Sequence, residues 1–498
     1  MASTTTATNT DLRRRRPALD QRVRGGVLLG GLLGLEALIG VGVGSSHYKY
    51  ALLLVVGIAV CWLVWRFPLP GAIGMLFLAA GIIYPQYYVF HFAGHTVYGY
   101  QIVLLVLLAR AAISPRASSW GGAAGGMLAL FFCALILSTM LAVHSGSTSL
   151  NNALIWAESF GALAMFWVVV RLFPDRHSLG VLLTAGIVLG AISGVVGLVL
   201  ALSGNLHSVF QDPSGSVLVT SQVGSLLRVR MPGLPLGFML LWVLLVWIAR
   251  GRGPRWLWWV CLPWILVDIL VSQNRNMWVV GTLSLVLVLM IAGPRVRGRL
   301  IGSLVLLCAA IAVLIAAPRG GSTAPSPLKP IITRASTILN PQAVSQSGSA
   351  TDRDYEDREG WATAKHHLGI GIGPGVFYGA TIADGPPDMS GDTPVGPRLF
   401  LQNQYLYLLL ITGIPGAAGF VLFLLISLRT AFIRGAPIES RMLGIGVLAL
   451  SLTAIVQLSF TDDSYVIALG LVAGAIAALR PPGGERSRAD AHADAAVA

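Results

Sequence analysis

Long apolar runs alternate with short polar connections along most of the chain. Fourteen such runs are found, at residues 26–44, 48–66, 70–90, 99–113, 124–143, 151–173, 179–203, 231–250, 255–272, 276–293, 299–317, 404–428, 441–461 and 463–479. An α-helix needs about 20 apolar residues to cross the hydrocarbon core of a bilayer. The pattern therefore predicts an all-α integral membrane protein, a polytopic bundle of transmembrane helices. Because 99–113 is short and 26–44 contains Glu36, the expected number of transmembrane helices is 12–14.

The placement of arginine predicts the orientation of these helices. Every second connection is rich in arginine: RAAISPR (110–116), RLFPDR (171–176), RGRGPR (250–255), PRVRGR (294–299) and RTAFIRGAPIESR (429–441). Short connections between them, such as 144–152 and 460–464, contain none. Because positive residues accumulate in cytoplasmic loops, we expect a plasma (inner) membrane protein with both termini in the cytoplasm.

This orientation divides the chain into five expected regions. They are a cytoplasmic tail (1–25), transmembrane helices (26–317), a large extracytoplasmic loop with short helices (318–403), further transmembrane helices (404–479) and a second cytoplasmic tail (480–498). The composition agrees, since 55% hydrophobic and 11% charged residues exclude an ordinary soluble domain. The net charge of +13 is almost entirely arginine, which suits anionic membrane lipid as a partner, and no nucleic acid is expected.

Three arginines depart from this charge rule. Arg275, in SQNRNMW, and Arg228 and Arg230, in SLLRVRMPG, fall on the outer side of the predicted membrane domain. An arginine there without a topological reason is a candidate for anion binding, because it stays charged and grips two oxygens at once. The alternatives for Arg275 are an ion pair with Asp268 on the preceding span and contact with lipid phosphate.

The outer loop contains two patterns of its own. DRDYEDREGWATAKHHLG (352–369) predicts a helix with Tyr355, Trp361 and Ala362 near one face and Gly369 as its stop. GIGIGPGVFYG (369–379) predicts a glycine-rich turn. Its backbone N–H groups could approach a phosphate, but the pattern matches no nucleotide motif, and a loop returning to the membrane surface is the alternative.

Three stretches together resemble the superfamily of O-antigen ligases and Wzy-type O-antigen polymerases, which are glycosyltransferases of the bacterial envelope. They are SQNRNMWVVGTLSLVLVL, DREGWATAKHHLGIGIGPGVF and LQNQYLYLLLITGIPGAAGFVLFLL, within about residues 228–428. The resemblance implies transfer of a saccharide from a polyprenyl-diphosphate-linked glycan to a hydroxyl of a glycan or glycolipid acceptor on the outer face. It implies no cofactor and no metal.

The resemblance and the chemistry of a diphosphate leaving group together suggest a set of site residues. The predicted catalytic residues are Arg275, Arg230, Gln402 and His367, and the predicted substrate-binding residues are Arg228, Arg358, Trp361, Asn403 and Asn274. The arginines would stabilise the negative charge that develops on the diphosphate.

The chain departs from the family at Gln402. The family pattern has histidine before asparagine at this point, as a candidate general base, and this chain has Gln402 before Asn403. Glutamine cannot accept a proton at neutral pH. Either another residue is the base, or the transfer proceeds without one, or activity is lost. The candidates for another base are His366 and His367, followed by Asp352 and Asp354; the alternative for the histidines is a solvated helix end.

A second class of function is a transporter or flippase for a lipid-linked glycan or another amphiphile. Such proteins also need many spans and buried charges, but they often contain internal repeats and charges at the midplane of the membrane. This chain has no evident repeat, and its unusual charges lie at the predicted outer edge beside a long loop. A glycosyltransferase is therefore favoured.

Overall fold

The computed structural model describes most of the expected helices. The described residues are 48–82, 89–92, 95–114, 120–203, 222–223, 226–227, 229, 231–294, 296–302, 348–379, 398–457, 460 and 462–480. The apolar segment expected at 26–44, most of that at 299–317, and the candidate site residues Arg228 and Arg230 lie outside them. The chain divides into two compact units, Met1–Phe67 and Pro68–Ala498.

In the first unit, the described residues form helix α2 (Tyr48–Arg66), as expected from the apolar segment 48–66. Its side chains Val56, Trp62 and Leu63 are exposed. The Arg66 guanidinium lies 5.7 Å from the centre of the Phe67 ring at the end of the helix. A helix that exposes apolar side chains and ends in an arginine is typical of a lipid-facing helix with a charged residue at the interface.

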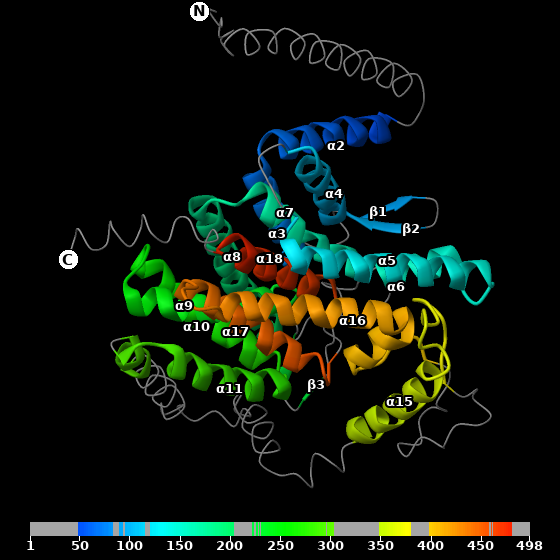
Figure 1. Cartoon of the computed structure of the whole chain (residues 1–498). Helices are drawn as coiled ribbons and strands as arrows, with labels where there is room; N and C mark the ends of the chain where they lie inside the picture. The colour runs from blue at the N-terminus through cyan, green and yellow to red at the C-terminus, as the bar shows by residue number, and fades with distance from the viewer. Residues whose placement is uncertain are drawn as a thin grey trace, which may run out of the picture. The chain divides into compact units, whose positions relative to one another are not determined.

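Helices of the second unit follow the remaining apolar segments (Figure 1). In chain order they are α3 (Pro68–Ala79), α4 (Gly99–Ala112), α5 (Gly122–His144), α6 (Leu150–Gly161), the 3₁₀ turn η2 (Ala162–Ala164), α7 (Met165–Leu172), α8 (Arg176–Ser203), α9 (Leu234–Arg250), α10 (Arg255–Val271), α11 (Arg275–Ile291), α15 (Gly348–Ala364), α16 (Gln404–Phe432), α17 (Ile438–Thr453) and α18 (Asp463–Ala478). The all-α fold class is confirmed.

Two short β-ribbons were not predicted. Strand β1 (Val89–Phe92) pairs antiparallel with β2 (His95–Tyr98), and β3 (Gln222–Val223) pairs with β4 (Leu226–Leu227). The apolar segment expected at 70–90 therefore begins as helix α3 and ends in a strand. Its last residues are aromatic and β-branched, which suit a strand as well as a membrane helix.

Four segments of the described chain are long and apolar enough to cross a membrane: Gly122–His144, Leu150–Leu172, Arg176–Ala201 and Gln404–Phe432. Other apolar helices, among them α9, α11 and α18, have 10–17 residues. A helix of 17 residues is about 25 Å long, slightly less than the hydrocarbon core of a bilayer. The membrane character is confirmed, and the total of 12–14 spans remains a prediction.

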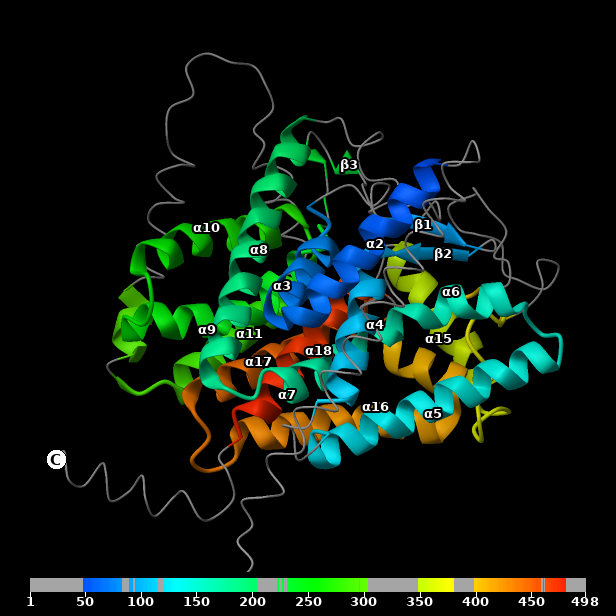
Figure 2. The ribbon, with the colours of Figure 1, turned by 90° about the horizontal axis from the view of Figure 1, so that it is seen from above.

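Helices α9 and α18 form the core of the second unit, and nearly all their residues are buried. Helix α18 contacts α7, α9, α16 and α17 (Figures 1 and 2). Small residues allow close approach: a β-carbon added at Gly190 of α8 would lie 2.5 Å from the Gly237 Cα of α9, and one added at Gly474 of α18 would lie 2.8 Å from the Val169 Cβ. Such contacts replace the hydrophobic effect as the cause of helix association in lipid.

Successive helices run in alternate directions, so their ends gather at two places. The start of α8, the end of α9 and the starts of α10 and α17 line one cavity together with the end of α18. The Arg252–Glu439 ion pair joins two of these ends. At the opposite ends, Asn274 before α11 contacts Gln457 after α17. The arginine-rich connections 171–176, 250–255 and 429–441 thus belong to one end of the bundle, as the alternation predicted; its assignment to the cytoplasm stays a prediction.

Candidate functional site

Helix α15 docks onto the segment before α16 with one narrow face. Glu356, Gly360 and Ala364, spaced four residues apart, are its buried positions. A β-carbon added at Gly360 would lie 2.7 Å from the Leu401 Cδ1. Glycine at this position therefore lets the loop helix pack closely against the entry to α16.

The sequence-based prediction of the apolar face of this helix is wrong. Trp361 is 53% exposed, Ala362 is also exposed, and Tyr355 is half-buried. The helix ends at Ala364 rather than at Gly369. The buried face was not recognised because it is centred on a carboxylate, and a carboxylate becomes a buried residue only when a partner from elsewhere in the chain neutralises it.

That partner is Arg398, which forms an ion pair with the buried Glu356 carboxylate. The backbone N–H of Gln402 also donates to the Glu356 Oε2, at 3.2 Å. The Arg353 Nε donates to the side-chain Oε1 of Gln402, at 2.6 Å. Gln402 thus holds the start of α15, and its amide oxygen is occupied by an arginine.

Asn403 connects the same segment to a titratable group. Its side-chain oxygen accepts from the Leu406 N–H at 3.2 Å and caps α16. The carboxylate of Asp357 lies beside the Asn403 side chain. Burial raises the pKa of Asp357, and Asp354 acts in the same direction, while Asn403 and Arg353 oppose the shift. A half-buried carboxyl with a raised pKa therefore lies directly beside the position where the family has histidine.

The glycine-rich turn packs against a break in helix α16. Gly413 has φ +66° and ψ −170°, so the helix is interrupted there. The N–H of Ile372 donates to the Leu410 oxygen at 2.8 Å, and the N–H of Gly373 donates to the Ile411 oxygen at 3.1 Å. The turn therefore supplies the donors for carbonyl groups that the break leaves without their helical partners.

Two other helices enclose the same turn. A β-carbon added at Gly373 would lie 2.5 Å from the Ala142 Cβ of α5. The Gly375 oxygen accepts from the Thr148 hydroxyl at 2.9 Å and from the Asn152 side-chain amide at 2.6 Å. The N–H of Gly371 donates to the His367 oxygen at 2.8 Å. The N–H groups of residues 371–373 are thus engaged within the protein and are not offered to a phosphate.

A strained turn places Arg275 at the start of α11. Gln273 has φ +48°, a left-handed conformation that is uncommon outside glycine. Its side chain is completely buried, and both amide atoms lack a hydrogen-bond partner among the described residues. The Ser272 hydroxyl accepts from the Asn274 N–H at 3.3 Å. Arg275 follows as the first, half-buried residue of the helix.

The connection between α17 and α18 joins this turn to the start of α16. The Asn274 side-chain amide donates to the Gln457 Oε1, and the Gln457 Nε2 donates to the Tyr465 hydroxyl at 3.0 Å. On the other side, the N–H of Gln404 donates to the Ala454 oxygen at 3.0 Å. The connection between α17 and α18 thereby contacts both Asn274 and Gln404, which lie about 130 residues apart in the sequence.

The alternative interpretation of Arg275, an ion pair with Asp268, is wrong. Asp268 is 1% exposed and lies beside Ser193 of α8. A β-carbon added at Gly197 of the same helix would lie 3.3 Å from its Oδ1. The carboxylate therefore faces α8 across the bundle, and within the described structure it forms no ion pair with Arg275.

The remaining predicted residues lie on the loop or outside the described chain. Arg358 pairs with Asp354 one turn earlier on α15, and both side chains are exposed. His367 is exposed directly after that helix. Arg228 and Arg230 are not among the described residues. The structure thus gathers Asn274 with Arg275 at one position and Gln402 with Asn403 at another, and it leaves Arg358, Trp361 and His367 on the surface.

Three polar residues of this region were missed by sequence reasoning. Glu356 and Asp357 belong to a run of charges in which no residue stands out, so only docking distinguishes them. Gln457 carried a recognisable signal, because it is an isolated amide in the apolar stretch LTAIVQLSF. An isolated amide at membrane depth needs a partner, and this requirement could have identified it as part of a polar connection.

Comparison with known families supports the resemblance. The family model described as O-antigen ligase matches residues 260–421, about a third of the chain. The matched segment contains the turn before α11, the docked part of the loop and the break in α16. No curated protein matches the chain. The expected relationship to the O-antigen ligase superfamily is confirmed.

Proposed function

We propose, on the premise that residues 260–421 form an O-antigen ligase domain, that the protein is a membrane glycosyltransferase of the cell envelope that uses a polyprenyl-diphosphate-linked glycan as donor. The acceptor is a hydroxyl of a glycan or glycolipid, and the reaction takes place on the outer face of the plasma membrane. The family match is the observation that carries this proposal. The α17–α18 connection, which contacts both the turn before α11 and the start of α16, also supports the proposal.

Arg275 is proposed to hold the diphosphate of the donor. It is half-buried at the first position of α11, where the first-turn N–H groups add partial positive charge. A guanidinium at this position offers two parallel hydrogen bonds to an anion. Arg228 and Arg230 precede α9 in the sequence and are proposed as further partners of the same diphosphate, with Asn274 orienting the donor.

Asp357 is proposed as the general base. Gln402 cannot accept a proton, and its amide oxygen is already engaged by Arg353. The Asp357 carboxylate lies beside the neighbouring residue Asn403, and burial raises its pKa. A raised pKa makes a carboxylate a better proton acceptor. His367 is the second candidate, and it is exposed at the end of α15.

The proposed reaction is a single displacement. The acceptor hydroxyl oxygen forms a bond to the anomeric carbon, and its proton passes to the Asp357 carboxylate. The bond between the anomeric carbon and the phosphate oxygen breaks, and its electron pair leaves with the polyprenyl diphosphate. Arg275 stabilises the charge that develops there. No nucleotide sugar and no metal is required by this scheme.

The test uses purified protein in liposomes that contain the lipid-linked glycan and a glycolipid acceptor. We expect release of polyprenyl diphosphate together with glycosylated acceptor, and loss of both products in Arg275→Ala. Product that forms only with the glycolipid indicates a ligase, whereas longer lipid-linked glycan without it indicates a polymerase. Movement of intact donor between leaflets, with no release of carrier, would instead identify a transporter.

A further inference from the structure

The cavity described above lies at the end of the bundle that carries the arginine-rich connections. It has a volume of about 550 Å³ and is formed by the start of α8, the end of α9, the starts of α10 and α17 and the end of α18. The turn before Arg275 lies at the opposite ends of these helices. The cavity therefore has no part in the glycosyl transfer proposed above.

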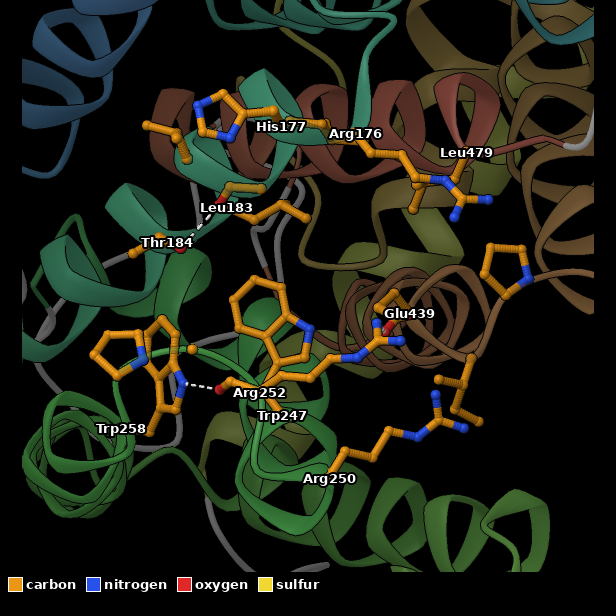
Figure 3. A pocket seen from close by; sticks show the side chains of 17 residues that line it. Arg176, His177, Leu183, Thr184, Trp247, Arg250, Arg252, Trp258, Glu439 and Leu479 are labelled. Atoms are coloured by element: carbon orange, nitrogen blue, oxygen red, sulfur yellow. Dashed lines mark hydrogen bonds and ion pairs between the residues drawn. The ribbon is translucent and has the colours of Figure 1, made fainter. Parts of the chain in front are cut away.

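Positive charge dominates the rim of this cavity. Arg176, Arg250 and Arg252 line it, and the one carboxylate in the lining is Glu439. Arg252 and Glu439 form an ion pair, whereas Arg176 and Arg250 form none with the described residues. In Figure 3 the Arg252–Glu439 pair is drawn between Arg176 and Arg250. Two uncompensated guanidinium groups thus remain at the rim.

The acidic residue nearest to Arg176 in sequence does not balance this charge. Asp175 accepts from the Ser178 N–H at 2.8 Å, and this hydrogen bond holds the pKa of Asp175 below its usual value. Its carboxylate caps the start of α8 and is not part of the cavity lining. The rim therefore keeps a net positive charge, which attracts an anion.

Below the rim the cavity is apolar. Leu179, Val181 and Leu183 of α8 form one wall, and Trp247 and Trp258 form another, with ring centres 5.2 Å apart. The Trp258 Nε1 donates to the Arg252 oxygen at 2.6 Å. The Trp258 ring thus presents mainly its apolar face, and tryptophan beside charged residues is typical of the membrane–water interface.

We infer that this cavity binds an anionic glycerophospholipid, with its phosphodiester at the rim that carries Arg176 and Arg250 and the upper parts of its acyl chains against the α8 wall and Trp247. A charged rim above an apolar wall matches the two halves of such a molecule. A nucleotide fits less well, because the Thr184 hydroxyl already donates to the Gly180 oxygen at 2.8 Å and the Trp258 N–H is engaged. His177 and the Trp247 N–H are the lining groups that could still read the edge of a base, and the ADP arm of the experiment tests that occupant.

The experiment measures lipid retained by the full-length protein in native mass spectrometry, from mixed micelles with equal amounts of phosphatidylglycerol and phosphatidylcholine. We expect wild-type protein to retain phosphatidylglycerol preferentially. Each arginine near a lipid phosphate contributes about fivefold in affinity, so Arg176→Gln/Arg250→Gln should lose roughly 25-fold. The matched control is Arg429→Gln/Arg434→Gln, which removes two exposed arginines from the same end outside the cavity, and it should stay within twofold of wild type.

Two further arms separate lipid from other anions and from misfolding. Arg176→Lys/Arg250→Lys keeps both charges and should retain the lipid within about threefold of wild type, although the bidentate contact is lost. Inorganic phosphate or ADP at millimolar concentration should not displace the lipid, because neither fills the apolar wall. Equal retention of the two lipids, an equal loss in the control, or displacement by phosphate or ADP would overturn the inference.

Discussion

Gly373→Ala tests whether the glycine turn is a packed joint between the loop that carries α15 and the helices α5 and α16. Gly373 has φ +89°, and a β-carbon there would lie 2.5 Å from the Ala142 Cβ and 2.8 Å from the Ser138 oxygen. A left-handed conformation costs an L-residue about 1 kcal/mol. Overpacking at a site that cannot relax costs about 1–3 kcal/mol more. The free energy of unfolding should therefore fall by about 2–4 kcal/mol.

Two other glycines separate these contributions. Gly435 has φ +82° but no atom within 4 Å of an added β-carbon, so Gly435→Ala should lose only the conformational part, about 1 kcal/mol. Gly369 has neither a left-handed φ nor a close neighbour, and Gly369→Ala should unfold like the wild type. The three variants differ from wild type by the same single methyl group.

The assay is thermal unfolding of the purified variants in one detergent, together with the rate of protease cleavage within 348–379. Gly373→Ala should have the lowest midpoint and the fastest cleavage, and Gly435→Ala an intermediate midpoint with normal cleavage. Equal midpoints for Gly373→Ala and Gly435→Ala would refute the packing argument, because the close contacts with α5 would then cost nothing. Donor consumption should fall in Gly373→Ala alone, since that turn holds the loop in place.

Three further predictions concern the site. Arg275→Lys keeps the charge but loses the bidentate contact, and carrier release should slow by roughly 10- to 150-fold, equivalent to about 1.5–3 kcal/mol. Gln457→Leu leaves the Asn274 amide unpaired and should lower the free energy of unfolding by about 1–3 kcal/mol, and Asn274→Leu in the same chain should recover part of this loss in thermal unfolding. Because burial raises the pKa of Asp357 in the folded chain, its ionisation opposes folding as pH rises, so Asp357→Asn should be slightly more stable than wild type near pH 7. Asp357→Asn should also abolish the fall in rate at low pH. If His367→Ala abolishes that fall and Asp357→Asn does not, the histidine is the base.

The helix boundaries were largely predictable because burial in lipid leaves a strong pattern in the chain. The segments expected at 255–272 and 463–479 are α10 and α18, which end within one residue of those limits. The break at Gly413 was not predictable from this pattern, because an apolar run stays apolar whether or not the helix inside it is continuous. The hairpin of β1 and β2 was missed for another reason, since all but its first two residues lie in the connection between two expected spans, where no element was predicted.

Sequence reasoning selected a candidate site residue mainly where that residue departed from a rule for membrane proteins. Arg275 was selected because it contradicts the charge rule, and its role stays a prediction, whereas Trp361 misled the prediction for α15. In a soluble loop an exposed tryptophan is unfavourable, but beside a membrane such a side chain is satisfied at the interface. Hydrophobicity therefore does not identify the packed face of a helix that lies close to lipid.

The replacement of histidine by Gln402 is consistent with the contacts around it. Its side-chain oxygen accepts from Arg353, while its N–H donates to Glu356, which is itself paired with Arg398. The neutral amide oxygen accepts a hydrogen bond from Arg353 at every pH. A histidine that takes up a proton would lose its acceptor nitrogen and place a second positive charge beside the guanidinium. The glutamine thus gives a pH-independent attachment of α15, at the cost of a proton acceptor. On the proposed mechanism the proton passes instead to a neighbouring group, and the Asp357 carboxylate lies beside the next residue, Asn403.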